Sequence, residues 1–187
     1  MTTYYLDASA LVKRYGSEVG SDWVLTITNR TANHTIVFSE ITLAEVSAAL
    51  AARQRAVQRF SVEARDRALS RFLQDCAEYF LLLQVDRSVI DQAVDLTQTH
   101  RLRGYDAVHL STALLANDDL ARQEHPPLVF VAADHDLLSA AQVEALWNVG
   151  TFERWHVGTL QVAGWDSSAR ALEVAGGVLI PWLAEGA

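Results

Sequence analysis

Four short runs of apolar, strand-forming residues constrain the fold more than any other feature of this sequence. They occupy residues 3–6, 36–38, 80–85 and 128–131, and segments with helical spacing of apolar residues separate them. The runs are continuously apolar and do not alternate with polar residues, which is typical of strands that are buried on both faces. Strands that alternate with helices favour a mainly parallel sheet covered by helices on both sides. The sequence therefore predicts an α/β fold.

The composition changes near residue 146. The segment 147–187 contains four of the five tryptophans, together with a Gly-Gly pair and a proline. We expect residues 1–146 to form one domain, because a chain of 187 residues suits one domain with an extension. The extension, residues 147–187, is an added hairpin, a partner-contact segment or a poorly ordered tail, and the sequence does not decide between these.

Three features favour a cytoplasmic protein. The single cysteine, Cys76, excludes an internal disulfide and fits a reducing compartment. The N-terminus has no basic region before its short apolar run, so we do not expect a signal peptide. No apolar run approaches the roughly 18 residues that a membrane span requires, so we expect no membrane segment.

The charge argues against one class of partner and leaves another open. A net charge of −8 and a pI near 5.1 argue against a general DNA-coating protein, which would carry a basic excess. A local basic patch is still compatible with nucleic acid. Six arginines fall within nineteen residues: Arg53, Arg55, Arg59, Arg65, Arg67 and Arg71. They are either solvated helix residues or guanidinium groups that contact phosphate oxygens.

Four carboxylates are placed to meet at one edge of the predicted sheet. Asp7 follows the first strand and Asp134 the last, whereas Glu45 and Asp106 lie near helix starts. Each aspartate alone is readily explained as a helix cap. Together, however, four carboxylates at the edge where ligands of parallel sheets bind would repel one another, and a hard divalent cation resolves this. No His or Cys set has zinc spacing, so Mg²⁺ or Mn²⁺ is expected.

A carboxylate-held pair of Mg²⁺ ions supports hydrolysis of a phosphodiester. One ion lowers the pKa of the attacking water, and both shield the charge that develops on the phosphorus oxygens. The acidic pattern therefore predicts a metal-dependent hydrolase acting on phosphodiester bonds.

Four motifs occur in a specific order: YLDASALVK (5–13), TLAEV (42–46), LRGYDAVHL (102–110) and VAADHDLL (131–138). In these motifs the chain resembles PIN-domain ribonucleases, in particular the VapC-like toxins of toxin–antitoxin modules. The resemblance implies a three-layer α/β/α sandwich and metal-dependent endonucleolytic cleavage of RNA. It also implies a homodimer and inhibition by a small antitoxin protein.

The resemblance also assigns roles to individual residues. Asp7, Glu45, Asp106 and Asp134 match the acidic quartet of the family. Asp7, Asp106 and Asp134 would hold the metal directly, and Glu45 would act through the metal or by ordering the attacking water. Ser9 matches a hydroxyl position beside the first aspartate, where it would bond to a carboxylate or a metal-bound water. Its hydroxyl is about as well explained by a local turn bond.

Three further positions are less decisive. Asp136 matches an often acidic position, where it either supports the metal site or caps a helix. Ala132 stands where the family often has threonine, so a hydroxyl that would support the metal ligands is missing there. His109 lies one helical turn after Asp106, and we expect a buried histidine with a structural role there.

Four basic residues are candidates for an RNA path: Lys13, Arg14, Arg101 and Arg103. Lys13 is equally well explained as a solvated surface residue.

Two other functions remain open. A non-catalytic PIN-like module would bind RNA or protein without cutting. An aspartyl-phosphate phosphatase would need a second aspartate two positions after Asp7, where Ser9 stands.

Overall fold

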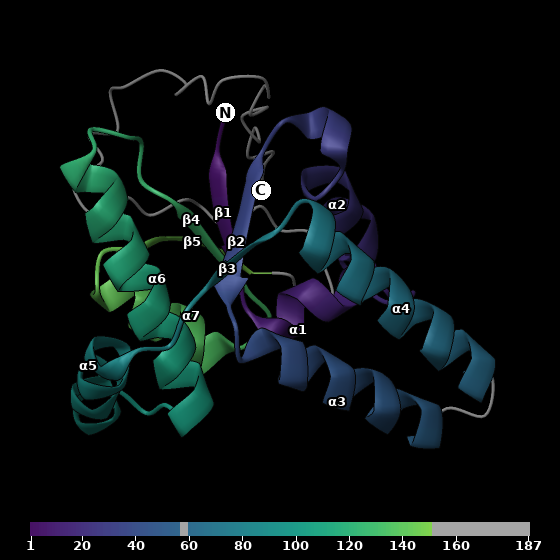
Figure 1. Ribbon diagram of the computed structural model, residues 1–187. Coiled ribbons are helices and arrows are strands. Elements are labelled where there is room, and N and C mark those ends of the chain that lie inside the picture. Colours follow the sequence, from purple (N-terminus) through teal and green to yellow (C-terminus); the bar gives the residue numbers. More distant parts are fainter. Residues whose placement is uncertain (57–59, 151–187) are drawn as a thin grey trace, which may run out of the picture.

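The computed structural model describes residues 1–56 and 60–150, and within them five strands form one sheet (Figure 1). The strands are β1 (Thr3–Leu6), β2 (Thr35–Ser39), β3 (Leu81–Leu83), β4 (Val129–Ala132) and β5 (Trp147–Gly150). Their order is β3-β2-β1-β4-β5, and every neighbouring pair is parallel. The predicted α/β fold with a parallel sheet is confirmed.

Helices cover both faces of this sheet. They are α1 (Ala8–Leu11), α2 (Ser21–Ile27), α3 (Thr42–Ala56), α4 (Val62–Glu78), α5 (Arg87–Thr99), α6 (Gly104–Arg122) and α7 (His135–Val143), with short 3-10 turns η1 (Val12–Arg14) and η2 (Arg30–Ala32). Helices α5, α6 and α7 pack on one face, and α1 to α4 pack on the other. The protein is thus the three-layer α/β/α sandwich that the sequence predicts.

The strand residues alternate between the two layers because successive side chains of a strand point to opposite faces. Tyr5 and Phe130 belong to the core under α5, α6 and α7, and their rings stack. Leu6 and Val131 belong to the core under α1 to α4. Both sets are completely buried, which explains why the sequence shows continuous apolar runs and not a polar alternation.

Two elements were not anticipated. Helix α2 buries only Val24 and Ile27 among its larger apolar residues, so its apolar pattern is short. Strand β5 pairs with β4 and carries the sheet past residue 146, so the sheet includes the first four residues of the segment predicted as an extension. Residues 151–187, the rest of that segment, lie outside the described residues. No helix of the described ranges combines the length and apolar character needed to span a membrane.

Candidate active site

The carboxyl ends of β1 and β4 bring two of the predicted acidic residues to the same edge. The two strands pair in parallel with Leu6 opposite Val131, and the backbone N–H of Asp7 donates to the Val131 carbonyl at 3.0 Å. Asp7 then caps α1, and Asp134 caps α7 by accepting from the Leu137 N–H at 2.9 Å. Parallel pairing therefore gathers residues that are far apart in sequence.

Asp7 is buried and has no lysine or arginine partner among the described residues. It is 4% exposed, and its carboxylate accepts the Ala10 N–H at 2.8 Å. The Ser9 hydroxyl lies 2.8 and 2.7 Å from the two carboxylate oxygens. Burial raises the pKa of Asp7, and the charge of His109 and these hydrogen bonds oppose the rise. No Lys or Arg of the described residues forms an ion pair with this carboxylate.

Ser9 connects the two ends of the site. Besides donating to Asp7, its Oγ accepts the backbone N–H of Ala133 at 2.8 Å. This hydrogen bond fixes the start of α1 against the loop that leads to Asp134. The serine therefore does more than form a local turn, although its bond to Asp7 is local as well. Ala132, immediately before this loop, is completely buried and adds no hydroxyl.

We call the carboxylates of Asp7, Glu45, Asp106 and Asp134 at this end of the sheet the acidic edge. Asp106 and Asp134 form its second part. Asp106 lies in the first turn of α6 and is half-buried, whereas Asp134 is exposed. Burial raises the pKa of Asp106, and the negative charge of Asp134 raises it further. The two carboxylates are thus close enough to repel each other electrostatically.

Glu45 reaches the site through a histidine. Nε2 of His109 lies 2.6 Å from Glu45 Oε2, and Nδ1 lies 3.0 Å from the Tyr5 hydroxyl. Because a carboxylate only accepts, Nε2 carries a proton and donates it to Glu45, and Nδ1 shares a hydrogen bond with the Tyr5 hydroxyl. His109 is 2% exposed. His109 is buried, as predicted, but its role goes beyond structure because the residue that it holds, Glu45, belongs to the acidic quartet.

The sequence did not indicate the contact between His109 and Glu45. His109 follows Asp106 by three positions, which places both on one helical face. That spacing was visible, but the approach of Glu45 from α3 was not.

Two buried hydroxyls at the same edge were also missed. Continuing the β1–β2 register places Ser39 beside Asp7, and Thr42 begins α3 one turn before Glu45. Both are completely buried, and neither hydroxyl finds a hydrogen-bond partner among the described residues. Unpaired buried hydroxyls are costly, so a water or ion with oxygen ligands would satisfy them.

The structure separates the four predicted basic residues. Lys13 is buried and donates to the Val19 carbonyl at 2.8 Å. Arg14 forms a buried ion pair with Asp75 at 2.9 Å. Neither side chain is available to RNA, so for these two the prediction of an RNA path is corrected: burial requires their charges to be paired internally.

The other two basic residues remain at the surface. Arg103 is exposed at the start of α6, and its charge helps to lower the pKa of Asp106 against the larger effect of burial. Arg101 is exposed and lies 3.9 Å from Asp136. Asp136 is exposed in the first turn of α7. The N-cap of that helix is Asp134, so Asp136 does not have the capping role that we considered for it.

The donor set fits a hard cation whose remaining ligands are waters. Within residues 1–56 and 60–150, no three His, Cys, Asp or Glu side chains lie close enough together to hold a metal ion between them. The acidic edge is therefore an open arrangement and not a closed cage. Mg²⁺ tolerates this because it keeps several waters and takes one or two carboxylates. The Asp106–Asp134 pair and the unpartnered hydroxyls of Ser39 and Thr42 are consistent with such a site.

The family model "PIN domain" matches residues 4–143, which include every acidic residue discussed above. The chain therefore belongs to the PIN-domain family. It is 32% identical over 141 residues to two proteins of Mycobacterium tuberculosis strains, named ribonuclease VapC45 and ribonuclease VapC49. Each match covers 75% of this chain and 90% of the relative.

Two solved structures share the fold. PAE2754 from Pyrobaculum aerophilum superposes with a TM-score of 0.50 at 22% identity, covering 74% of this chain and 84% of that one. A chain of a toxin–antitoxin complex from Klebsiella pneumoniae gives a TM-score of 0.53 at 16% identity, covering 81% of this chain and 99% of that one. At these identities the similarity concerns the fold alone.

Proposed function

We propose that this protein is a divalent-metal-dependent endoribonuclease and the toxin of a toxin–antitoxin pair. The observation that carries the proposal is Asp7, a buried carboxylate with a raised pKa and no lysine or arginine partner among the described residues. It shares its sheet edge with the mutually repelling pair of Asp106 and Asp134. The two curated relatives that bear the name ribonuclease support RNA as the substrate.

Asp7, Asp106 and Asp134 would hold Mg²⁺ or Mn²⁺, in part through metal-bound waters, because no three described carboxylates lie close enough to hold one ion between them. Glu45 would act beside them. We place Asp136 outside this set because its carboxylate lies near Arg101. When bound, the cation would supply shielding for the charge that develops on the phosphate and would acidify a water molecule.

Residues of the protein itself position the carboxylates of Asp7 and Glu45. Ser9 fixes the Asp7 carboxylate through its hydroxyl, and His109 fixes Oε2 of Glu45. The second oxygen of Glu45 then accepts a proton from the attacking water. The water oxygen forms a bond to phosphorus as the bond to the 3′-oxygen breaks, and the leaving oxygen takes a proton from solvent. The products carry a 5′-phosphate and a 3′-hydroxyl.

The biological setting forms part of the same proposal. A small antitoxin would block the enzyme, and a basic side chain of the antitoxin would balance the negative charge of the acidic edge. The solved toxin–antitoxin complex with the same fold supports a partner of this kind. We further propose a homodimer that acts in the cytoplasm.

Mapping of cleavage ends in total RNA tests the proposal. The wild-type protein is expected to produce new 5′-phosphate ends with Mg²⁺ or Mn²⁺ and none with EDTA, and Asp106→Asn is expected to produce none in either condition. Cleavage that continues at an unchanged rate in EDTA would refute the metal-dependent reaction.

The absence of a closed ligand set in the described residues makes a non-catalytic RNA- or protein-binding module the second candidate. Calorimetric titration with Mn²⁺ separates the two. The nuclease requires binding that is weakened by Asp7→Asn, whereas a scaffold would show no such dependence.

A further inference from the structure

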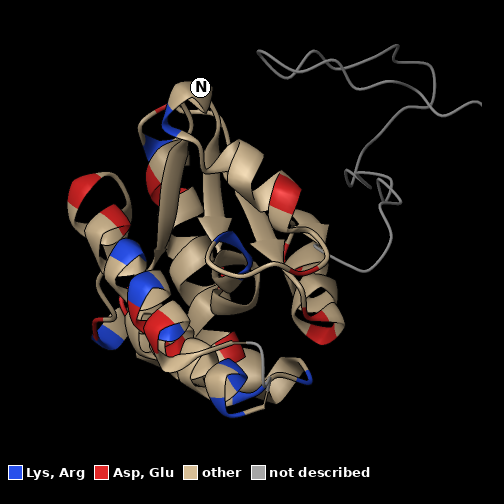
Figure 2. Ribbon diagram, turned by 90° about the vertical axis from the view of Figure 1, so that its right-hand side faces the viewer, with Lys and Arg blue, Asp and Glu red and all other residues tan. Residues whose placement is uncertain are grey.

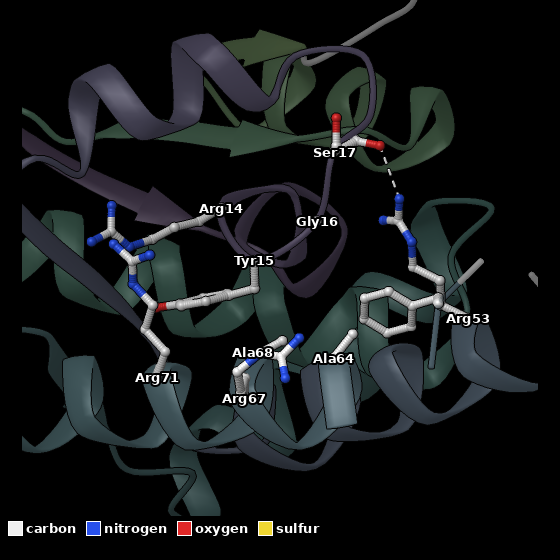
Figure 3. A pocket seen from close by; sticks show the side chains of 10 residues that line it. Arg14, Tyr15, Gly16, Ser17, Arg53, Ala64, Arg67, Ala68 and Arg71 are labelled. Atoms are coloured by element: carbon white, nitrogen blue, oxygen red, sulfur yellow. Dashed lines mark hydrogen bonds between the residues drawn. The ribbon is translucent and has the colours of Figure 1, made fainter. Parts of the chain in front are cut away.

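A pocket lined by arginines lies outside the acidic edge. It is a cavity of about 620 Å³ between the loop that follows η1 and helices α3 and α4 (Figure 3). Four arginines and two aromatic residues contribute to its lining: Arg14, Arg53, Arg67, Arg71, Tyr15 and Phe60. None of the described residues that line it is acidic. In a chain with a net charge of −8, such a concentration of guanidinium groups indicates an anionic ligand.

Two of the four arginines are held by the protein itself. Arg14 pairs with the buried Asp75, which also accepts the Tyr15 hydroxyl at 2.7 Å. Arg53 donates to the Ser17 carbonyl at 2.9 Å, as the dashed line in Figure 3 shows, and pairs with Glu18 at 3.5 Å. These bonds fix the walls of the pocket.

The other two arginines are less constrained, although the exposed Glu63, one turn before Arg67, interacts with Arg67 electrostatically. Arg67 and Arg71 are exposed on α4, and neither forms an ion pair or hydrogen bond with another described residue. They stand four positions apart on one helical face, where like charges disfavour the helix slightly. Figure 2 shows that basic and acidic turns are interspersed on this side of the molecule, so the pocket is a local basic site and not part of a broad basic surface. An anion bridging Arg67 and Arg71 would remove their repulsion.

The shape of the pocket favours a nucleotide strand over a small anion. The Arg53 guanidinium lies 5.5 Å from the centre of the Phe60 ring, and both side chains belong to the pocket lining. Single-stranded RNA is bound by stacking of bases on such side chains together with guanidinium contacts to phosphates. A lone phosphate would leave most of the cavity empty.

The pocket also lies within reach of the acidic edge. Helix α3 carries Glu45 in its first turn and Arg53 in its last, eight positions later. At 1.5 Å per residue the two lie about 12 Å apart along the helix, a span that a short single-stranded segment covers. The acidic edge repels phosphates, and Lys13 and Arg14 are turned inward, so the strand must be held elsewhere.

We propose that this pocket binds the backbone of the RNA substrate a few nucleotides from the cleaved bond, with Arg67 and Arg71 contacting phosphate oxygens and the Arg53–Phe60 pair contacting a base. The proposal rests on the proposed ribonuclease function. It adds a site that lies apart from the acidic residues.

The test compares two double variants of the full chain that remove the same charge. Arg67→Gln/Arg71→Gln changes the pocket, and Arg65→Gln/Arg87→Gln changes one half-buried and one exposed arginine outside its lining. Both are made with Asp106→Asn to prevent cleavage. Binding of a fluorescein-labelled 12-nucleotide oligouridylate is measured by anisotropy over a range of salt concentrations, and urea unfolding verifies that each variant is folded.

The pocket variant is expected to raise the Kd about tenfold and to reduce the slope of log K against log salt by about 1.4, since each phosphate contact on a single strand contributes about 0.7. The control variant is expected to leave the slope nearly unchanged. Equal losses in both double variants would overturn the proposal, because they would show a general charge effect.

Two further measurements separate the remaining outcomes. With Asp106 intact, the pocket variant is expected to raise KM for RNA and to leave kcat near the wild-type value. If the wild type cleaves RNA but the pocket variant keeps its Kd and salt slope, the pocket proposal fails and the ribonuclease remains. If the pocket variant loses binding only to an oligoglutamate peptide, the site belongs to a protein partner and the proposal is overturned. If the wild type neither binds nor cleaves RNA, both proposals fail.

Discussion

Helices α1 and α5 begin with the same local arrangement in opposite surroundings. In each, an aspartate is the N-cap, a serine two positions later donates to its carboxylate, and the backbone N–H three positions later donates as well. The two sets are Asp7, Ser9 and Ala10 for α1, and Asp86, Ser88 and Val89 for α5. Asp7 is buried, whereas Asp86 is exposed.

The pKa values move in opposite directions. Hydrogen bonds from Ser88 and from the backbone lower the pKa of Asp86. Burial raises the pKa of Asp7 in spite of equivalent hydrogen bonds. The capping pattern is therefore not what distinguishes a functional aspartate from a structural one. The distinction comes from the tertiary surroundings, which desolvate one carboxylate and leave the other in water.

The largest expected effect separates the two aspartates directly. Asp7→Asn is expected to reduce RNA cleavage by more than about 100-fold, beyond what loss of an outer partner of a metal ligand costs. Asp86→Asn is expected to cleave at the wild-type rate because its carboxylate only caps a helix. Single-turnover cleavage with excess enzyme measures both. Equal losses in the two variants would remove the functional distinction.

The next largest expected effect concerns the two serines that donate to these aspartates. Ser9 also accepts the Ala133 N–H, whereas the only hydrogen bond of the Ser88 hydroxyl among the described residues goes to Asp86. Ser9→Ala is therefore expected to reduce cleavage and Mn²⁺ affinity by about 10- to 100-fold. Ser88→Ala is expected to change neither by more than about twofold. A wild-type Mn²⁺ affinity in Ser9→Ala would show that the hydroxyl holds only the turn.

Asp7 has a buried histidine, His109, in its surroundings, whereas no histidine acts on Asp86 among the described residues. His109→Ala removes the donor to Glu45 and is expected to reduce kcat about tenfold, with little change in KM. His109→Gln keeps an amide N–H that can reach the carboxylate, so it is expected to recover part of the loss. If alanine and glutamine behave alike in kcat while both proteins remain folded, the histidine serves packing alone.

Much of the fold was predictable because it depends on patterns that are local in sequence. The apolar runs at residues 3–6 and 128–131 indicated buried parallel strands, and the helix starts followed from capping residues such as Ser61. Strand β5 escaped prediction because its four residues, Trp147–Gly150, lie at the start of a segment of unusual composition. It is a strand through its pairing with β4, and pairing is not visible in the sequence.

The acidic residues were predictable as candidates, but their surroundings were not. The sequence pattern indicated that Asp7 and Asp134 follow strands at one edge of the sheet, and the structure adds that these two strands are neighbours. Spacing gave no indication that Arg14 would turn inward to Asp75, or that His109 would join Tyr5 to Glu45. Such contacts depend on which helices pack together, and that information is tertiary.

The smallest expected effect is on stability, and it reverses sign between the two aspartates. The pKa of Asp7 is raised above its ordinary 3.8, so between these two values the folded state binds more protons than the unfolded state. Stability then falls as pH rises through that window. The pKa of Asp86 is lowered below 3.8, so the stability that Asp86 contributes is present above that value and is lost as pH falls.

Urea unfolding in EDTA from about pH 3 to pH 7 measures both effects. Relative to the wild type, Asp7→Asn is expected to become more stable as the pH rises above 3.8. Asp86→Asn is expected to become less stable up to that value and to stay level above it. Asp106 titrates in the wild type and in both variants, so its contribution cancels in these differences. Parallel curves for Asp7→Asn and Asp86→Asn would show that burial does not set Asp7 apart, and the comparison between the two helix starts would then carry no functional meaning.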